Sequence, residues 1–253
     1  MEAQPLRVAS VNIEGQRHLK ERILPFLKDI NPDVALLQEV FYRDLRLFSQ
    51  TLQMEAVFAP MRVRPLDYLR NDCPMYPWGV AILSGIPITE CQALYYDRFS
   101  DDLPLGHPDH KDDTETEHDN NAKVLLKAKV EKAGSLFNLA TTHFTWTPNG
   151  QPSPQQWKTL ERIKAFLDQD DRLIFTGDTN APRGGPIWAK FCETFTDGIP
   201  QDVTTTIDGN FHKAGPRPLV VDGLFNRGYR VSNVRVIDGI SDHCAVTGEA
   251  HSD

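Results

Sequence analysis

The chain has 253 residues, of which 40% are hydrophobic and 25% are charged, and its 35 acidic and 27 basic residues give a formal net charge of -8. These proportions are typical of a globular protein with a sizeable core, and no apolar run approaches the roughly 18 residues that span a bilayer. The N-terminus has no apolar signal segment and the four cysteines form no C-x-x-C pair, so we expect reduced thiols and a cytoplasmic location.

The first 52 residues alternate between apolar strands and amphipathic helices. Leu6–Asn12 reads as a buried strand, and residues 19–30 carry apolar side chains at three- and four-residue steps, which predicts a helix that Pro25 kinks or splits. Val34–Gln38 is a short apolar strand that delivers Glu39 at its C-terminal end. Helical spacing follows over residues 41–52.

Residues 97–119 break this pattern, with nine acidic and two basic residues and no periodicity. They predict a solvated acidic loop inserted into one domain that covers residues 1–253. Its three histidines leave a second cation site open as an alternative to simple solvation (His107, His110 and His118). Outside the loop 26 acids face 25 bases, so the net charge does not exclude a polyanionic substrate, although it disfavours tight non-specific binding to long nucleic acid.

Strands dominate the rest of the chain. A helix begins at Ser153, where Gln156 completes a capping box, and we expect it to bury Trp157, Leu160 and Ile163. Because strands outnumber helices, two packed sheets with helices outside are favoured over one doubly wound sheet. The predicted strands are Trp78–Leu83, Val124–Val130, Leu136–Thr142, Leu173–Thr176, Leu219–Phe225 and Val231–Ile237.

Polar residues follow or interrupt these apolar strands at six places. One such residue is most often a hydrogen-bonded core residue, but six strand ends together indicate a shared site. The residues are Asn12, Glu39, His143, Asp178 with Asn180, Asp222, and Asp242 with His243.

The residue types at these positions suit attack of water on a phosphoester. Mg²⁺ prefers oxygen ligands, which makes Glu39 a candidate ligand. Asp178 and Asn180 are two residues apart, so both side chains project the same way from an extended segment. Asp222 could fix the tautomer of the His243 ring and keep it protonated, and the ring would then stabilise phosphate charge.

The motifs V-N-I-E-G, L-L-Q-E-V, T-T-H-F, T-G-D-T-N, V-D-G-L-F and S-D-H occur in the order found in the endonuclease/exonuclease/phosphatase superfamily, which the chain resembles over residues 6–247. The resemblance implies a four-layer α/β/β/α sandwich of two packed mixed sheets with helices on the outer faces. It also implies a phosphohydrolase that depends on Mg²⁺ or Mn²⁺. We expect a phosphoester substrate, with nucleic acid as one candidate, and no obligate protein partner.

The resemblance assigns roles to the polar residues. Glu39 resembles the principal metal ligand, with Asn12 nearby, and Asp242 either joins the metal shell or orients its neighbour. Asp178 resembles the residue that aligns or deprotonates the attacking water. Asn180, His143 and His243 resemble the residues that contact the phosphate and the transition state. Asp222 resembles the acid that pairs with His243.

The substrate is less constrained. N-I-E-G and G-D-T-N look similar to tyrosyl-DNA phosphodiesterase type 2, but Ala181–Gly185 departs from that branch, and His143 stands where apurinic endonucleases usually carry tyrosine. A phosphodiester is favoured; a phosphatase acting on a soluble or lipid-linked phosphate and a non-catalytic phosphate-binding protein are the alternatives. Three further residues are candidates for substrate contact: Arg183, Lys213 and Trp146. The alternative for Arg183 is an exposed turn, for Lys213 a surface loop, and for Trp146 packing beneath a loop.

Overall fold

The computed structural model describes residues 4–66, 73–97, 103 and 122–252. The strands are β1 (Leu6–Asn12), β2 (Val34–Phe41), β3 (Glu55–Pro65), β4 (Met75–Ser84), β5 (Ile88–Asp97), β6 (Lys123–Lys132), β7 (Ser135–His143), β8 (Leu173–Asp178), β9 (Thr196–Asp197), β10 (Asp222–Arg227), β11 (Arg230–Ile237) and β12 (Ala245–His251). The helices are η1 (Leu19–Ile23), α1 (Leu24–Ile30), η2 (Tyr42–Asp44), α2 (Leu45–Leu52), η3 (Pro148–Gly150), α4 (Pro154–Leu167) and α5 (Pro186–Cys192).

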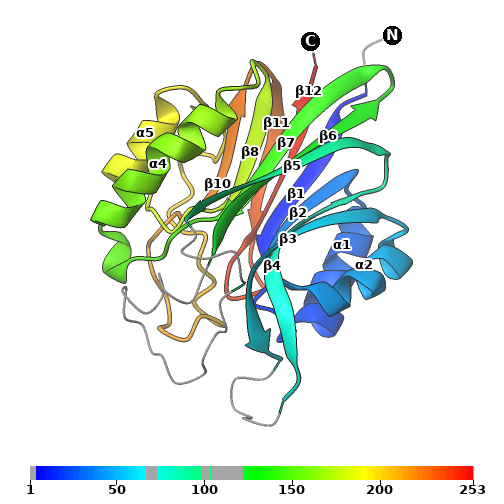
Figure 1. The fold of residues 1–253 in the computed structure, drawn as a ribbon, viewed down its shortest axis with the longest axis horizontal. Helices are drawn as coiled ribbons and strands as arrows, with labels where there is room; N and C mark the ends of the chain where they lie inside the picture. Colours follow the sequence, from blue (N-terminus) through cyan, green and yellow to red (C-terminus); the bar gives the residue numbers. More distant parts are fainter. Residues whose placement is uncertain (1–3, 67–72, 98–102, 104–121, 253) are drawn as a thin grey trace.

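The strands form two mixed six-stranded sheets, in the orders β11-β12-β1-β2-β4-β3 and β5-β6-β7-β8-β10-β9. We call them sheet A and sheet B. Helices α1 and α2 cover the outer side of sheet A, and α4 and α5 lie on the opposite side of the molecule beside sheet B (Figure 1). The expected α/β/β/α sandwich is therefore confirmed.

Alternation along the central strands of sheet A divides the apolar residues between two cores. Val8 and Leu36 belong to the core that extends between the sheets, whereas Ala9 and Leu37 belong to the core beneath α1 and α2. Successive side chains of a strand point to opposite faces, so a strand buried on both faces reads as a continuous apolar run. This is why β1 and β2 were recognisable from sequence.

Helix α4 begins as its capping residues predict. The Ser153 side chain accepts a hydrogen bond from the Gln156 backbone, and the Gln156 side chain accepts one from the Ser153 backbone, a cap that contributes about 1 kcal/mol. Leu160 and Ile163 are fully buried as expected. The prediction that Trp157 is buried is wrong, because its side chain lies beside the buried stripe of the helix and is 38% exposed.

Other elements differ from the expectation in extent. The predicted helix over residues 19–30 is split, with Pro25 in the first turn of α1, where its missing N–H costs nothing. Strand β10 begins at Asp222 rather than Leu219. The predicted acidic loop, with its three histidines, lies outside the described residues apart from Asp97 and Leu103. All four cysteines are free, and none of the helices in the described ranges is long and apolar enough to cross a bilayer.

Candidate active site

Three strands of sheet B place polar side chains in one row. Strand β7 pairs in parallel with β8, which aligns His143 with Asp178, and the antiparallel pairing of β10 with β8 aligns Asp178 with Asp222. Residues in register on adjacent strands project from the same face. The row depends on Gly177, which has a φ of +132°. A Cβ at this position would lie 2.1 Å from the Thr142 carbonyl oxygen, so no side chain fits there.

Sheet A contributes residues from the neighbouring strands β1 and β2. Asn12 pairs with Gln38 at the end of β1, and the register of β2 shifts between Leu37 and Val40 where it pairs with β4. The bulge contains Glu39, which has a left-handed φ of 62°. A bulge redirects a side chain and is common beside active sites. The prediction that Glu39 ends the strand is therefore wrong; the strand continues through it to Phe41.

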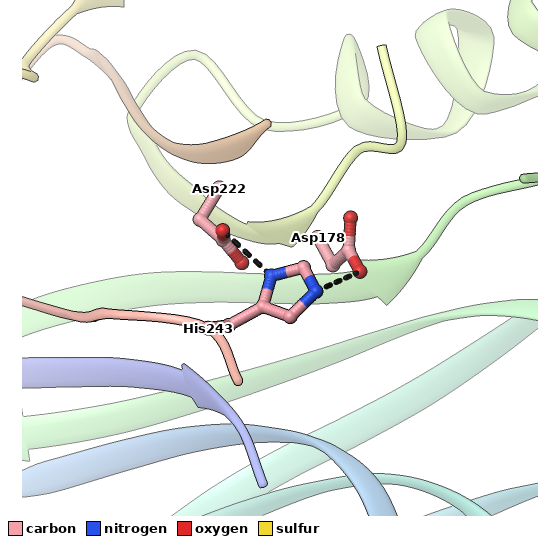
Figure 2. A group of neighbouring side chains, drawn as sticks. All are labelled: Asp178, Asp222 and His243. Carbon is pink, nitrogen blue, oxygen red and sulfur yellow. Dashed lines mark hydrogen bonds and ion pairs between the residues drawn. The ribbon is translucent and has the colours of Figure 1, made fainter. Parts of the chain in front are cut away.

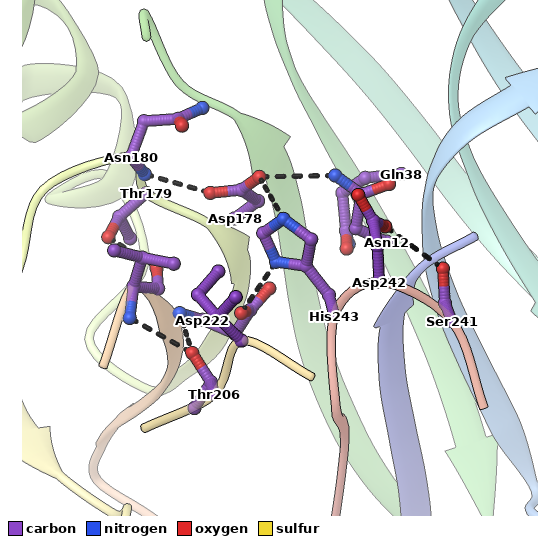
Figure 3. Close-up of polar contacts among 12 residues, drawn as sticks. Asn12, Gln38, Asp178, Thr179, Asn180, Thr206, Asp222, Ser241, Asp242 and His243 are labelled. Carbon is purple, nitrogen blue, oxygen red and sulfur yellow. Dashed lines mark hydrogen bonds and ion pairs between the residues drawn. The ribbon is translucent and has the colours of Figure 1, made fainter. Parts of the chain in front are cut away.

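The two sheets meet through the amide of Asn12. Its Nδ2 atom donates to Glu39 Oε1 and to Asp178 Oδ2, each at 3.1 Å. The His143 ring spans the same gap, with Nε2 3.5 Å from Asp178 Oδ2 and Nδ1 4.0 Å from Glu39 Oε1. Figure 3 shows Asn12 reaching from sheet A to Asp178 of sheet B. Residues from both sheets therefore meet around Asp178.

His243 enters from the loop before β12 and lies between two carboxylates. Its Nδ1 atom is 2.9 Å from Asp222 Oδ2, and its Nε2 atom is 3.7 Å from Asp178 Oδ2 (Figure 2). The hydroxyl of Thr206 accepts a hydrogen bond from the Asp222 backbone, and the Thr206 carbonyl accepts one from Cys244. Sequence reasoning missed Thr206, since a threonine in an irregular segment gives no signal.

Asn180 follows Asp178 in a left-handed turn with φ 47°. Its backbone N–H donates to Asp178 Oδ1 at 2.9 Å, and its side-chain Nδ2 donates to the Phe144 carbonyl at 2.9 Å. One amide proton of Asn180 therefore fixes the turn, which leaves the second for another partner.

Burial and neighbouring charges shift the pKa values of Asp178, His243 and His143 in different directions. Burial raises the pKa of Asp178 to about 7 against the opposing charge of His243. Burial alone lowers the pKa of His243, but Asp222 and Asp178 outweigh it and raise that pKa well above its usual value. Burial, reinforced by the positive charges of Lys123 and His243, lowers the pKa of His143 well below its usual value, so this ring is neutral.

Carboxylates accumulate on the sheet A side of the site. Burial and the charge of Asp242 raise the pKa of Glu39 despite the opposing charge of Arg64, and burial and Asp242 also raise the pKa of Glu14. These groups repel one another, and a hard divalent cation with oxygen ligands would relieve the repulsion. The buried Nδ1 of His143 has no hydrogen-bond partner among the described residues. The residues therefore fit a metal ion.

A second group could also hold a metal by spacing alone. Ligand atoms of Asp178, Asp222 and His243 lie within 4.8 Å of one another. Both ring nitrogens of His243 face carboxylates, however, and a ring protonated on both nitrogens has no lone pair for a metal. The group of Glu39, Asn12 and Asp242 is therefore the better candidate for a metal site.

The three flanking residues differ in their positions. Trp146 and Lys213 line a pocket of about 290 Å³ together with Asn180. Arg183 instead pairs with Asp197, with Nε 3.0 Å from Oδ2, and donates to the Ile199 carbonyl at 2.9 Å. Arg183 lies in a turn, but these contacts bury most of its side chain and it does not line the pocket, so we do not propose it as a substrate contact.

The sequence matches the Endonuclease/Exonuclease/phosphatase family model over residues 9–243. No curated protein matches the sequence. Similar solved structures include the human Nocturnin catalytic domain with bound sulfate (20% identity, 98% of this chain and 93% of that one, TM-score 0.67) and mannosyl-6-phosphatase from Bacteroides thetaiotaomicron (14% identity, 97% and 99%, TM-score 0.70). A third is humanized TDP2 from D. rerio (17% identity, 98% and 99%, TM-score 0.63). At these identities the structures share the fold.

Proposed function

The chain belongs to the Endonuclease/Exonuclease/phosphatase family, and on that premise we propose that it is a divalent-metal-dependent phosphoesterase that favours diesters. One observation carries the proposal. Asn12 from sheet A and the two histidines His143 and His243 converge on Oδ2 of Asp178, at 3.1, 3.5 and 3.7 Å. A buried carboxylate surrounded by donors is suited to hold and deprotonate a water molecule.

The proposed cofactor is Mg²⁺ or Mn²⁺, held by Glu39, Asn12 and Asp242, with Glu14 beside them. A divalent ion there supplies Lewis-acid stabilisation of a phosphoryl oxygen. The fit rests on the acidic side chains gathered there: burial raises the pKa of Glu39 and of Glu14, and the charge of Asp242 raises both further.

The reaction is in-line displacement at phosphorus. The water oxygen forms a bond to phosphorus while its proton passes to Asp178, and the bond from phosphorus to the leaving oxygen breaks on the opposite side. The leaving oxygen takes a proton from solvent. His243, protonated and held by Asp222, compensates the charge that develops on the phosphoryl oxygens, and His143 and Asn180 contribute neutral N–H donors.

The diester preference follows from charge. A monoester is close to a dianion at neutral pH, whereas a diester is a monoanion, and the carboxylates of Glu14, Glu39 and Asp242 repel the dianion more strongly. The proposed location stays cytoplasmic, which the four free cysteines support.

The test is turnover of bis-p-nitrophenyl phosphate, p-nitrophenyl phosphate and a 5'-blocked oligonucleotide, each with Mg²⁺, Mn²⁺ or a chelator. The proposal expects chelator-sensitive turnover that is faster on the diester. Chelator-resistant activity would refute metal dependence, and faster monoester turnover would make the protein a phosphatase. No turnover on a broad panel of phosphoesters would leave a phosphate-binding protein.

A further inference from the structure

A pocket lies beside the proposed catalytic residues. Three segments line it: residues 146–150 after β7, the turn at Asn180, and parts of residues 207–221. Its volume is about 290 Å³, just below the roughly 300–1,000 Å³ of ligand sites. Because Asn180 lines both the pocket and the reaction site, the pocket is in position to receive a group attached to the scissile phosphate.

Half of the pocket lining is apolar. Trp146 is partly exposed and lines the pocket, whereas Trp157 on α4 lies elsewhere on the surface. Indole rings stack on planar rings at about 1–3 kcal/mol per base. The other apolar residues of the lining are Pro148, Ile207, Ala214, Leu219 and Val221.

The rest of the lining carries two cations, Lys213 and Arg217, and none of the described lining residues is acidic. His212 also belongs to the lining, and burial lowers its pKa. The His212 Nδ1 atom accepts a hydrogen bond from the Ala214 backbone at 3.2 Å, so its ring proton is on Nε2. The metal side of the site carries Glu14, Glu39 and Asp242. The site therefore has an acidic half suited to a cation and a basic half suited to an anion.

Hydrogen bonds and ring contacts fix the loop that presents these basic residues. The Asp208 backbone donates to the Asp242 carbonyl, and the Thr205 hydroxyl donates to the Arg217 carbonyl at 2.6 Å. The Phe211 ring packs against Arg22, at 4.4 Å from the guanidinium, and against His18, at 4.9 Å between ring centroids. Because this loop is already fixed by these contacts, it loses little conformational entropy when a ligand binds.

We propose that this pocket selects phosphoesters in which the scissile phosphate is attached to a group with a planar ring and a second anionic substituent, as in a nucleotide. The ring stacks on Trp146, and the second anion lies near Lys213 and Arg217. The inference rests on the proposed phosphoesterase function and names its substrate class. A free nucleotide and the end of a nucleic-acid strand share this chemistry.

The test uses four p-nitrophenyl phosphodiesters whose second ester group is methyl, phenyl, thymidin-5'-yl or 3'-phosphothymidin-5'-yl. The leaving group is constant, so the series adds a ring and then a second anion. We expect kcat/KM to rise from methyl to thymidine and again with the 3'-phosphate, about fivefold or more at each step. Trp146→Ala should reduce the thymidine-to-methyl ratio, and Lys213→Met should reduce the gain from the 3'-phosphate.

Two matched controls separate the pocket from general effects. Trp157→Ala removes a partly exposed indole from α4, and Lys28→Met removes an exposed lysine from α1, and neither should change these ratios. Turnover of the whole series with ratios unaffected by Trp146→Ala and Lys213→Met would refute the pocket assignment but leave the phosphoesterase intact. No turnover of any ester would refute the phosphoesterase itself.

A last comparison distinguishes a free nucleotide from the end of a nucleic-acid strand as the natural ligand. The best ester is extended with an oligonucleotide attached through its 3'-phosphate. Faster turnover of the extended ester would assign the pocket to a strand end, and equal or slower turnover would assign it to a free nucleotide.

Discussion

The carboxylate of Asp178 has a structural role and, in the proposed reaction, a chemical one. Its Oδ1 atom accepts the Asn180 backbone N–H, which shapes the turn, while Oδ2 faces Asn12 and the two histidines. Burial raises its pKa to about 7. A general base works best when its pKa lies near the operating pH, so this carboxylate is matched to proton transfer near neutrality.

Asp178→Asn should lower kcat by on the order of 100-fold or more, because asparagine keeps the shape and accepts the Asn180 hydrogen bond but takes no proton. The measurement is kcat on bis-p-nitrophenyl phosphate at saturating metal, with circular dichroism to verify the fold. Asp44→Asn is the control, since burial also raises the pKa of Asp44, which lies outside the proposed catalytic groups. Near-full activity of Asp178→Asn would remove Asp178 from the water-activating role.

Glu39→Gln should act mainly on metal affinity. The substitution removes the charge from the bulge of β2 while keeping an oxygen ligand, so we expect the Mg²⁺ concentration for half-maximal activity to rise at least about tenfold. Direct titration with Mn²⁺ gives the same quantity without turnover. Glu90→Gln, on the exposed edge strand β5, serves as the matched control. An unchanged affinity would place the metal elsewhere, with the group of Asp178, Asp222 and His243 as the next candidate.

At the residue scale, the sequence predicted the polar residues that the fold brings together better than those that hold them in place. Polar residues such as Asn12 and Asp178 stand out against apolar strands, and their order matches the family motifs. Thr206 could not be found, because its role depends on a backbone contact made only after the chain folds. The sequence also left open whether Arg183 contacts substrate, because its partner Asp197 lies in a segment for which the sequence predicted no element.

At the element scale, burial on both faces made most of the central strands predictable. Strands β1, β2, β7 and β8 lie inside their sheets and read as apolar runs. Of the four missed strands, β3, β5 and β9 lie at sheet edges and β12 lies next to one, and β5 exposes most of its first six side chains. Edge strands carry polar residues that limit further pairing, which removes the apolar signal. The bulge at Glu39 was also missed, because a positive φ at a glutamate has no sequence signature.

Gly177→Ala should separate β7 from β8 and disturb the row that carries Asp178. The added Cβ would lie 2.1 Å from the Thr142 carbonyl oxygen, at a φ of +132°. We expect a loss of about 3 kcal/mol or more in the free energy of unfolding, from strain and overpacking together. Gly134→Ala has φ +79° but nothing within 4 Å, so it measures the strain alone, about 1 kcal/mol. Urea unfolding that shows equal losses for the two variants would contradict the close-packing argument.

At the scale of the whole molecule, the proposed activity requires both sheets, since sheet A supplies Asn12 and Glu39 and sheet B supplies His143, Asp178 and Asp222. The apolar core between the sheets holds them together, but hydrophobic burial does not fix how one sheet is oriented on the other. A polar contact with defined geometry joins the sheets at the end of β6. The Lys132 ammonium lies 2.6 Å from Asp33 Oδ2, which also accepts the Arg7 backbone N–H of β1 at 2.7 Å.

Asp33→Asn tests this connection through its pH dependence. Burial alone raises the pKa of Asp33, but the hydrogen bonds from Lys132 and Arg7 outweigh it and lower that pKa. A carboxyl whose pKa is lower in the folded than in the unfolded state stabilises the fold above the unfolded pKa of about 3.9, and the stabilisation is lost as the pH falls through the folded pKa. Wild-type protein should therefore exceed Asp33→Asn by about 1–3 kcal/mol at pH 7 and pH 5.

The difference should shrink at pH 3 and below, where the wild-type carboxyl also becomes neutral. Urea unfolding at the three pH values measures it. Glu90→Gln is the control, because Glu90 pairs with Lys129 inside sheet B at 3.0 Å with 60% of its side chain exposed, and it should cost no more than about 1 kcal/mol. A loss for Asp33→Asn that stays constant from pH 7 to pH 3 would show that packing, not the charge of Asp33, holds this end of the sheets together.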